Sequence, residues 1–389
     1  MIPRHLTPKL REVAGYYPVA VVTGPRQSGK TTVCRAAFPA HRYVSLEALD
    51  SREYATTDPR GFLNEYRNGV ILDEIQNVPG LLSYLQEVVD ADPAPGRFVL
   101  TGSQQFNLAA SISQSLAGRC GMLTLLPPTF AELQAFPNAP TNLLDALFNG
   151  AYPRIFDRKI PASRWLADYA ATYIQRDVRQ IVNVGDLQSF TAFLTLCAGH
   201  TAQEINLARL GSGAGVVHNT ARAWLSVLET SYIVHRLPPW HTNVKKQVVK
   251  AAKLHFIDSG LACHLLGIRN AEQLRAHPLR GAIFESWVVS EVLKSFMNRG
   301  LSPDLRHYRE TRGMEVDLLI AGAGQVSAVE MKSGATIAAQ WFTNLDRFGE
   351  RLNNAHDVLR QFIVYGGDEG QSRSNCTVLS WRDVGRLSA

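Results

Sequence analysis

Short apolar runs alternate with longer amphipathic stretches over the first 150 residues. Five of these runs have the length of buried strands: PVAVVTG, RYVSLE, GVILDE, RFVLTGS and GMLTLLP. The segments TTVCRAAF and GLLSYLQEVVDA, which lie between strands, have the spacing of amphipathic helices. Strands that alternate with helices predict an α/β fold with a parallel sheet covered on both faces.

The pattern changes in the second part of the chain. FTAFLTLCAGH, INLARLGSGAG and HNTARAWLSVLETSYIVHRL predict three helices of a winged helix-turn-helix, with YIVHRLPPW as its wing. A long helix over 279–296 then precedes the strands LRHYRE, MEVDLLIA and QVSAVEMKS, the helix TIAAQWFTNLDRF and the strand QFIVYGG. We therefore predict three domains: a parallel-sheet α/β domain at 1–150, a helical and winged-helix domain at 151–276 and a second α/β domain at 277–389.

Composition narrows the class of protein. The 389 residues are 46% hydrophobic and carry a net charge of +6, which fits a globular chain with a nucleic-acid partner. The five cysteines form no Cys-x-x-Cys pair, so neither a zinc site nor a disulfide framework is expected. We find no apolar stretch of the ~18 residues that a membrane span needs. The start MIPRHLTPKL lacks the apolar core of a signal peptide, and we expect a cytoplasmic protein without a membrane partner.

The segment GPRQSGKTT follows the first strand and opens a helix. It fits G-x-x-x-x-G-K-[ST], in which glycines let backbone N–H groups close around a phosphate at a helix N-terminus. Lys30 is expected to reach the β and γ phosphates, and the Thr31 hydroxyl to hold Mg²⁺. We predict ATP and Mg²⁺ as ligands, and the nucleotide-binding residues Gly24, Pro25, Arg26, Gln27, Ser28, Gly29, Lys30, Thr31, Thr32 and Asp73.

Polar residues at the ends of other strands complete this prediction. VILDE places Asp73 where it would bind Mg²⁺ and Glu74 where it would polarise the attacking water. RFVLTGS ends in Ser103, which we expect to touch the γ-phosphate or the water. Arg119 in SLAGR is either a finger on the ATP of a neighbouring copy in a homo-oligomer or a surface arginine. The strand RYVSLE between the two motifs is typical of ATPases with an extra strand between them in the sheet.

A basic stretch lies beside the predicted wing. No acidic residue occurs between Glu229 and Asp258, and the gap holds five basic residues: Arg236, Lys245, Lys246, Lys250 and Lys253. Such a strip suits DNA phosphates. Two alternatives stay open, a solvated basic face and a winged helix that contacts only protein.

Four polar residues of the last domain suggest a second site. Glu285 interrupts an apolar helix face, and Glu330 and Lys332 share one face of a strand because side chains repeat every two residues. With Asp317 of the preceding strand, Glu330 would bind Mg²⁺ that generates hydroxide for phosphodiester cleavage. Lys332 would either position the water or stabilise the phosphorane, and Glu285 would support the metal from the helix. The alternative is a nuclease fold kept only for binding.

The motifs GPRQSGKTT, VILDEIQ, TGSQ with SLAGR, GAYPRIF and YIQRDV resemble a family of prokaryotic AAA-type ATPases. The C-terminal domain of that family is related to restriction-endonuclease folds, and the set Glu285, Asp317, Glu330 and Lys332 resembles the site of such nucleases. The chain departs from these patterns at Ser103, where many AAA proteins have Asn, and at Val316, where a proline is common. The resemblance implies ATP binding.

Three functions follow from these features. The first is an ATP-hydrolysing enzyme that binds DNA and cuts it with the last domain. The second is a nucleotide-switched DNA- or protein-binding ATPase whose nuclease-like domain is not catalytic. The third is a signalling or toxin-linked ATPase with a protein target.

Overall fold

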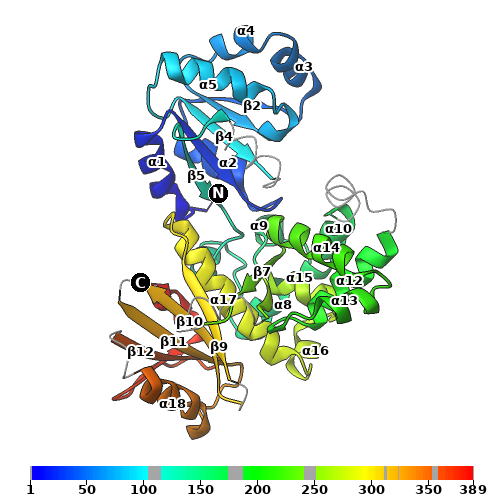
Figure 1. The fold of residues 1–389 in the computed structure, drawn as a ribbon, viewed down its shortest axis with the longest axis vertical. Helices are drawn as coiled ribbons and strands as arrows, with labels where there is room; N and C mark the ends of the chain where they lie inside the picture. Colours follow the sequence, from blue (N-terminus) through cyan, green and yellow to red (C-terminus); the bar gives the residue numbers. More distant parts are fainter. Residues whose placement is uncertain are drawn as a thin grey trace. The chain divides into compact units, whose positions relative to one another are not determined.

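The computed structural model describes residues 2–103, 115–173, 187–240, 251–310, 313–322, 324–352 and 358–388. The chain forms two compact units (Figure 1). The first consists of residues 1–128 with 230–232 and 297–301, and the second of residues 129–229, 233–296 and 302–389. Within the described residues, no helix combines the length and apolar character that a membrane span needs.

The first unit is built on a five-stranded parallel sheet, as the alternating pattern predicted. Its strands are β1 (Val19–Thr23), β2 (Arg42–Ser45), β3 (Val70–Asp73), β4 (Phe98–Gly102) and β5 (Cys120–Thr124), in the order β2-β3-β4-β1-β5. One strand does separate β1 from β3, but it is β4. The strand RYVSLE, on which this prediction rested, forms β2 at the edge, because its only partner is β3.

Helices cover both faces of this sheet (Figure 1). Ala20 and Val22 of β1 pack with residues of α1 and α2, whereas Val19 and Val21 pack with residues of α4 and α5. This division follows from the two-residue period of a strand. The helices of the unit are α1 (Leu6–Tyr16), α2 (Lys30–Ala37), α3 (Leu49–Thr57), α4 (Pro59–Asn64), η1 (Ile75–Asn77) and α5 (Leu81–Ala91).

The second unit begins with a helical part. Its helices are α7 (Phe130–Leu133), α8 (Leu143–Asn149), α9 (Pro153–Asp157), α10 (Ala162–Tyr173), α12 (Leu187–Gly199), α13 (Leu207–Gly213), α14 (His218–Thr230), α15 (Ser259–Leu265) and α16 (Ala271–Arg275). A small antiparallel sheet has the order β6-β8-β7 and consists of β6 (Gln203–Glu204), β7 (Val234–Leu237) and β8 (Lys253–Phe256). The chain order is therefore α12, β6, α13, α14, β7, β8.

The last part of the second unit is a six-stranded mixed sheet with the order β13-β14-β12-β11-β10-β9. Its elements are α17 (Arg280–Asn298), β9 (Asp304–Arg309), β10 (Glu315–Gly322), β11 (Gln325–Lys332), η4 (Ala339–Trp341), α18 (Thr343–Leu352), β12 (Val358–Tyr365), β13 (Gln371–Ser372), β14 (Thr377–Ser380) and η5 (Trp381–Ser388). The strands β9, β10 and β11 pair antiparallel, as their short turns predicted. The strands β13 and β14 were not predicted.

A β-bulge interrupts β10. The pairing with β9 runs from Val316 opposite Tyr308 to Leu319 opposite Arg306, so two residues of β10 face one residue of β9. Val316 and Leu319 both pack in the core that includes Phe348 of α18. Residues three apart in a regular strand point to opposite faces, and the bulge therefore brings both into one core.

Candidate functional site

The loop between β1 and α2 can close only with glycine at two positions. Gly24 has φ +143°, and a Cβ atom there would lie 2.1 Å from the carbonyl oxygen of Leu125. Gly29 has φ +94° and directly precedes α2. Arg4 fixes the loop from outside, because its guanidinium donates hydrogen bonds of 2.8 Å to the carbonyls of Ser28 and Leu126. The backbone N–H groups at the start of α2 are thus held in place for an anion.

Two side chains of the loop fit a phosphate ligand. The Lys30 ammonium donates to the carbonyls of Gly24 (3.0 Å) and Pro25 (2.9 Å), and burial lowers the pKa of Lys30. The Ser28 hydroxyl is buried without a hydrogen-bond partner. A buried cation whose hydrogen bonds go to neutral carbonyls, beside an unpaired hydroxyl, gains from an incoming anion.

The two residues predicted to hold Mg²⁺ lie in contact. The Thr31 hydroxyl is 2.9 and 3.0 Å from the carboxylate oxygens of Asp73, at the end of β3. Tyr43 donates to the same carboxylate over 2.8 Å, and Thr101 also donates to it. Hydroxyl and carboxylate oxygens are ligands that Mg²⁺ accepts, so these residues fit the ion. The sequence prediction missed Tyr43 and Thr101, whose roles depend on β2 and β4 flanking β3.

Glu74 is held in an unusual backbone conformation beside the loop. Its φ of 57° is rare for a residue with a side chain and is common at functional sites. Ser103 donates to its carboxylate over 2.9 Å, and Gln76 donates both to this carboxylate and to Ser103. Burial would raise the pKa of Glu74, but the charge of Lys30 and these hydrogen bonds outweigh it and lower the pKa. Glu74 is therefore an ionised carboxylate with a fixed orientation at neutral pH.

The remaining predicted nucleotide residues belong to the loop itself and to the first turn of α2. Gln27 has φ 64°, and the charge of Arg26 contributes to the low pKa of Glu74. Thr32 borders a groove of about 460 Å³ whose lining also includes Ile2, Pro8 and Val33. Arg119 is not part of this cluster: its guanidinium makes a two-point ion pair with Asp90 of α5, with one contact at 2.8 Å. Its role as a finger stays a prediction.

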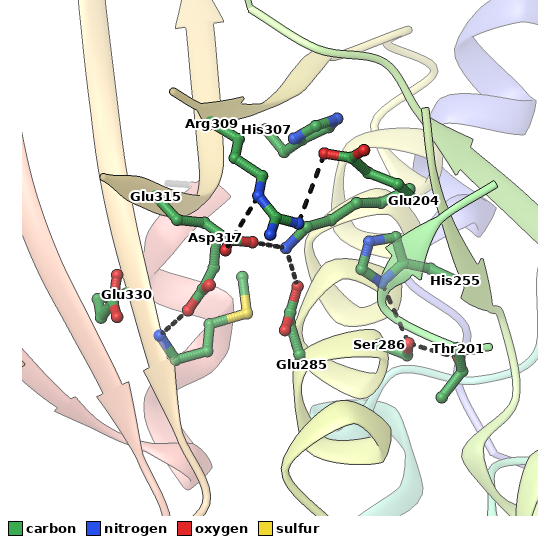
Figure 2. A network of polar contacts seen from close by, with 12 residues as sticks. Thr201, Glu204, His255, Glu285, Ser286, His307, Arg309, Glu315, Asp317 and Glu330 are labelled. Carbon is green, nitrogen blue, oxygen red and sulfur yellow. Dashed lines mark hydrogen bonds and ion pairs between the residues drawn. The ribbon is translucent and has the colours of Figure 1, made fainter. Parts of the chain in front are cut away.

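The four polar residues of the C-terminal domain lie together, and a second lysine, Lys253, joins them. The ammonium of Lys253, in β8, lies 2.8 Å from Glu285 of α17 and 2.6 Å from Glu315 of β10. Figure 2 shows both carboxylates turned toward this nitrogen. Lys332 lies 2.5 Å from Glu330 and 3.8 Å from Asp317, whose carboxylate also accepts from the N–H of Met331 at 2.8 Å. Asp317 and Glu330 thus share one cation, and it is Lys332.

Burial controls the charges of this cluster. Burial, and then the charge of Asp317, raise the pKa of Glu285 to about 8 and that of Glu330 to about 7. Burial opposes the charge of Lys253, but the surrounding carboxylates outweigh it and raise its pKa. Glu285 and Glu330 therefore hold a proton more readily than exposed carboxyls do, whereas Lys253 stays charged.

A divalent metal ion does not fit the cluster as it stands. Among the described residues, no three His, Cys, Asp or Glu side chains are placed to hold a metal ion. Glu285, predicted to support the metal, instead pairs with Lys253, because β8 brings this lysine between α17 and β10. The other oxygen of Glu330 is buried without a partner, which is the one feature that favours the predicted metal role of Asp317 and Glu330.

The predicted basic strip is partly wrong. Lys253 is buried in β8 and neutralised by carboxylates, so it cannot contact DNA phosphates. Arg236 pairs with Glu229. The other three basic residues of the strip, Lys245, Lys246 and Lys250, lie outside the described residues.

A buried histidine near Lys253 should make the second unit sensitive to acid. Burial, and then the Lys253 ammonium, lower the pKa of His307 to about 4. The folded form binds a proton more weakly than the unfolded chain, whose His titrates near 6.5. The contribution of neutral His307 to the free energy of unfolding is therefore complete above pH 6.5 and is lost as the pH falls toward 4. The shift corresponds to about 3 kcal/mol of unfolding free energy.

The parent chain should lose unfolding free energy as the pH falls from 7 to 4, and we expect His307→Gln to lose about 3 kcal/mol less. Urea unfolding at pH 7, 5.5 and 4 measures this difference. His218→Gln is the control, because His218 is exposed at the start of α14. A pH dependence that is identical in His307→Gln and the parent chain would contradict the assignment.

Comparisons with known proteins agree with the N-terminal site. Residues 16–134 match the family model of an AAA domain. Residues 140–272 and 280–384 match two domains of unknown function, DUF8612 and DUF4143. An uncharacterized protein of Mycobacterium tuberculosis, Rv2008c, is 28% identical over 340 residues, which cover 86% of this chain and 74% of that protein. An uncharacterized protein of Haemophilus influenzae is 20% identical over 277 residues, which cover 67% of this chain and 64% of that protein.

Similarity to solved structures is more distant. The Walker-type ATPase of Pyrococcus abyssi aligns with 14% identity and a TM-score of 0.46, over 67% of this chain and 94% of that one. DnaA from Aquifex aeolicus, bound to AMPPCP, aligns with 16% identity and a TM-score of 0.30, over 58% of this chain and 85% of that one. The AAA family match, the parallel sheet and the loop geometry together identify residues 16–134 as an AAA-type ATPase domain.

Proposed function

We propose that this ATPase hydrolyses ATP with Glu74 as the group that orients and polarises the attacking water. The observation that supports this role is the ionised Glu74 carboxylate, fixed by Ser103 and Gln76 beside the phosphate-binding loop. Lys30 neutralises charge that develops on the phosphates, and Thr31 and Asp73 hold Mg²⁺. When bound, Mg²⁺ stabilises the negative charge of the transferring phosphoryl group. Measurement of ATP turnover by the purified chain and its Glu74 variant tests this proposal.

The groove beside Thr32 suits the purine base of the nucleotide. Thr32, which borders the groove, directly follows Thr31 in the sequence. Apolar side chains such as Ile2, Pro8 and Val33 line the groove. A flat aromatic ring gains from burial against apolar side chains, whereas phosphates bind the backbone N–H groups of the loop. We assign this groove to the base.

DNA is the partner that we propose for the middle domain. The chain order α12, β6, α13, α14, β7, β8 and the sheet order β6-β8-β7 support the predicted winged helix-turn-helix. In this arrangement α14 is the recognition helix. Its N-terminal part exposes His218, Asn219 and Arg222, whereas Trp224 and Leu225 face the core. Exposed donors on the first turns of such a helix suit base edges and phosphates.

We expect Arg222→Glu to weaken binding to duplex DNA about tenfold at 150 mM KCl, because one cation is lost and one repulsive charge is added. Fluorescence anisotropy with a labelled duplex measures this change. Arg164→Glu is a matched control with the same change in net charge, at an exposed residue of α10 that pairs with Asp168. Equal affinities of the two variants would remove α14 from the proposed interface.

Phosphodiester cleavage by the C-terminal domain stays a prediction. The order α17, β9, β10, β11, α18, β12 agrees with the order predicted from the sequence for a nuclease-like domain, and it favours the prediction. The pairing of Lys253 with Glu285 favours the alternative, in which the domain does not cut. We therefore propose an ATP-hydrolysing, DNA-binding protein as the function. Metal-dependent plasmid cleavage that is lost in Asp317→Ala would reverse this preference.

A further inference from the structure

A tyrosine closes the C-terminal end of α14. Tyr232 lies two residues after this helix and has φ 57°, a backbone conformation that is rare for a residue with a bulky side chain. The N–H of Ile233 donates to the carbonyl of Leu228 over 2.9 Å, a bond typical of a helix that ends in a left-handed residue. Glycine is usual at such a position, so Tyr232 occupies it at a cost in backbone strain.

The side chain of Tyr232 is buried in the first unit. Residues 230–232 belong to this unit, whereas residues 218–229 of α14 belong to the second. The Tyr232 hydroxyl lies 3.2 Å from the hydroxyl of Thr23 and 3.3 Å from that of Thr124. These threonines stand opposite each other at the ends of β1 and β5, and their hydroxyls are 3.2 Å apart. Tyr232 therefore joins the ends of two adjacent strands.

Thr23 directly precedes the phosphate-binding loop. The N–H of Leu125 donates to the Thr23 carbonyl over 2.8 Å, and the carbonyl of the next residue, Gly24, accepts from the Lys30 ammonium at 3.0 Å. An ATP phosphate is a stronger acceptor for this ammonium than a neutral carbonyl. Nucleotide binding therefore changes the hydrogen bonds of the residue next to Thr23, which contacts Tyr232.

We propose that Tyr232 couples nucleotide binding in the loop to the C-terminal end of α14. Its hydroxyl is bound to the ends of β1 and β5, and its strained backbone closes the helix. A nucleotide that orders the loop thus holds Tyr232 more firmly and stabilises the last turn of α14. The inference rests on the proposed binding of ATP and, through α14, gives ATP control over the proposed binding of DNA.

Hydrogen exchange of the full chain, with and without the ATP analogue AMPPCP and Mg²⁺, tests this coupling. In the parent, the N–H groups of residues 226–233 should exchange about fivefold or more slowly with AMPPCP, because the helix end opens less often. In Tyr232→Phe, which lacks only the hydroxyl, AMPPCP should change this exchange less than about twofold. Tyr54→Phe is the matched control, since the Tyr54 hydroxyl contacts Glu65 in the same unit, and should respond as the parent does.

DNA binding provides a readout that a merely structural hydroxyl would not change. In the parent, AMPPCP should change the affinity for a labelled duplex about fivefold, and the duplex should change the affinity for AMPPCP by the same factor. Both factors should fall below about twofold in Tyr232→Phe. A parent without DNA affinity would contradict the proposed partner, and the exchange measurement would then decide the role of Tyr232.

Two results would overturn the inference. One is an equal exchange response to AMPPCP in the parent and in Tyr232→Phe. The other needs no variant and stays decisive even where Tyr232→Phe does not fold: unchanged exchange at residues 226–233 of the parent, at an AMPPCP concentration that calorimetry shows to be saturating. A parent that binds no AMPPCP in calorimetry would contradict the proposed ATPase as well as the coupling.

Discussion

Glu74→Gln should bind ATP as the parent does and hydrolyse it about 10²- to 10⁴-fold more slowly, the range typical of a lost general base. The amide has nearly the shape of the carboxylate, so Ser103 and Gln76 can still contact it. It carries no charge and cannot take a proton from water. Steady-state phosphate release and ATP binding in parallel measure the two effects.

Glu87→Gln controls for the loss of a carboxylate in the same unit. Glu87 lies on the surface of α5 in an exposed ion pair with Arg60, and such pairs contribute little. Its turnover should match that of the parent. Normal turnover in Glu74→Gln would show that another group orients the water.

Lys30→Ala should lower ATP affinity about 30- to 150-fold, the cost of about 2–3 kcal/mol for a lost charge-assisted hydrogen bond to phosphate. The ammonium already lies inside the loop, bound to the carbonyls of Gly24 and Pro25, and needs no large movement to reach a phosphate. Isothermal titration calorimetry with ATP and Mg²⁺ measures the change.

Lys9→Ala is the control for this variant, because Lys9 pairs with Glu12 on the surface of α1 in the same unit. It should bind ATP with the affinity of the parent. A Lys30→Ala chain with unchanged affinity would place the phosphates elsewhere than in the loop.

The N-terminal sheet and its loop could be predicted because their information is local. A buried parallel strand is a short apolar run, and the glycine spacing of the loop is contiguous in the sequence. Strand ends in a parallel sheet meet at one edge, so the contact of Thr31 with Asp73 and that of Ser103 with Glu74 follow from the strand order. The contact of Gln76 with Glu74 could have been predicted in the same way, since Gln76 lies only two residues after Glu74.

The strand order itself was not local information. The sequence places β2 between the two nucleotide motifs in the chain, yet β4 lies between them in the sheet. The contacts of Tyr43 and Thr101 with Asp73 depend on that order. No pattern within either strand distinguishes an edge position from a central one.

The buried position of Lys253 was also not predictable from its local sequence. In the sequence it ends a stretch free of acidic residues, which suggests a solvent-exposed basic surface. Its carboxylate partners lie 32 residues away and beyond on α17 and β10. The apolar residues that follow Lys253 in KLHF were the available sign, because a charged residue in a buried strand needs a partner.

The bulge of β10 limits how this strand can change in evolution. Side chains on its two halves keep their faces only because one extra residue stands opposite β9. Deletion of a single residue between Val316 and Leu319 would restore regular pairing and leave both in the core, because residues two apart in a regular strand share a face. Deletion of a residue anywhere else in β10 would turn one half of the strand over. Relatives should therefore differ in the length of β10 only within this stretch, because an alignment gap placed elsewhere in the strand would assign apolar positions to the wrong face.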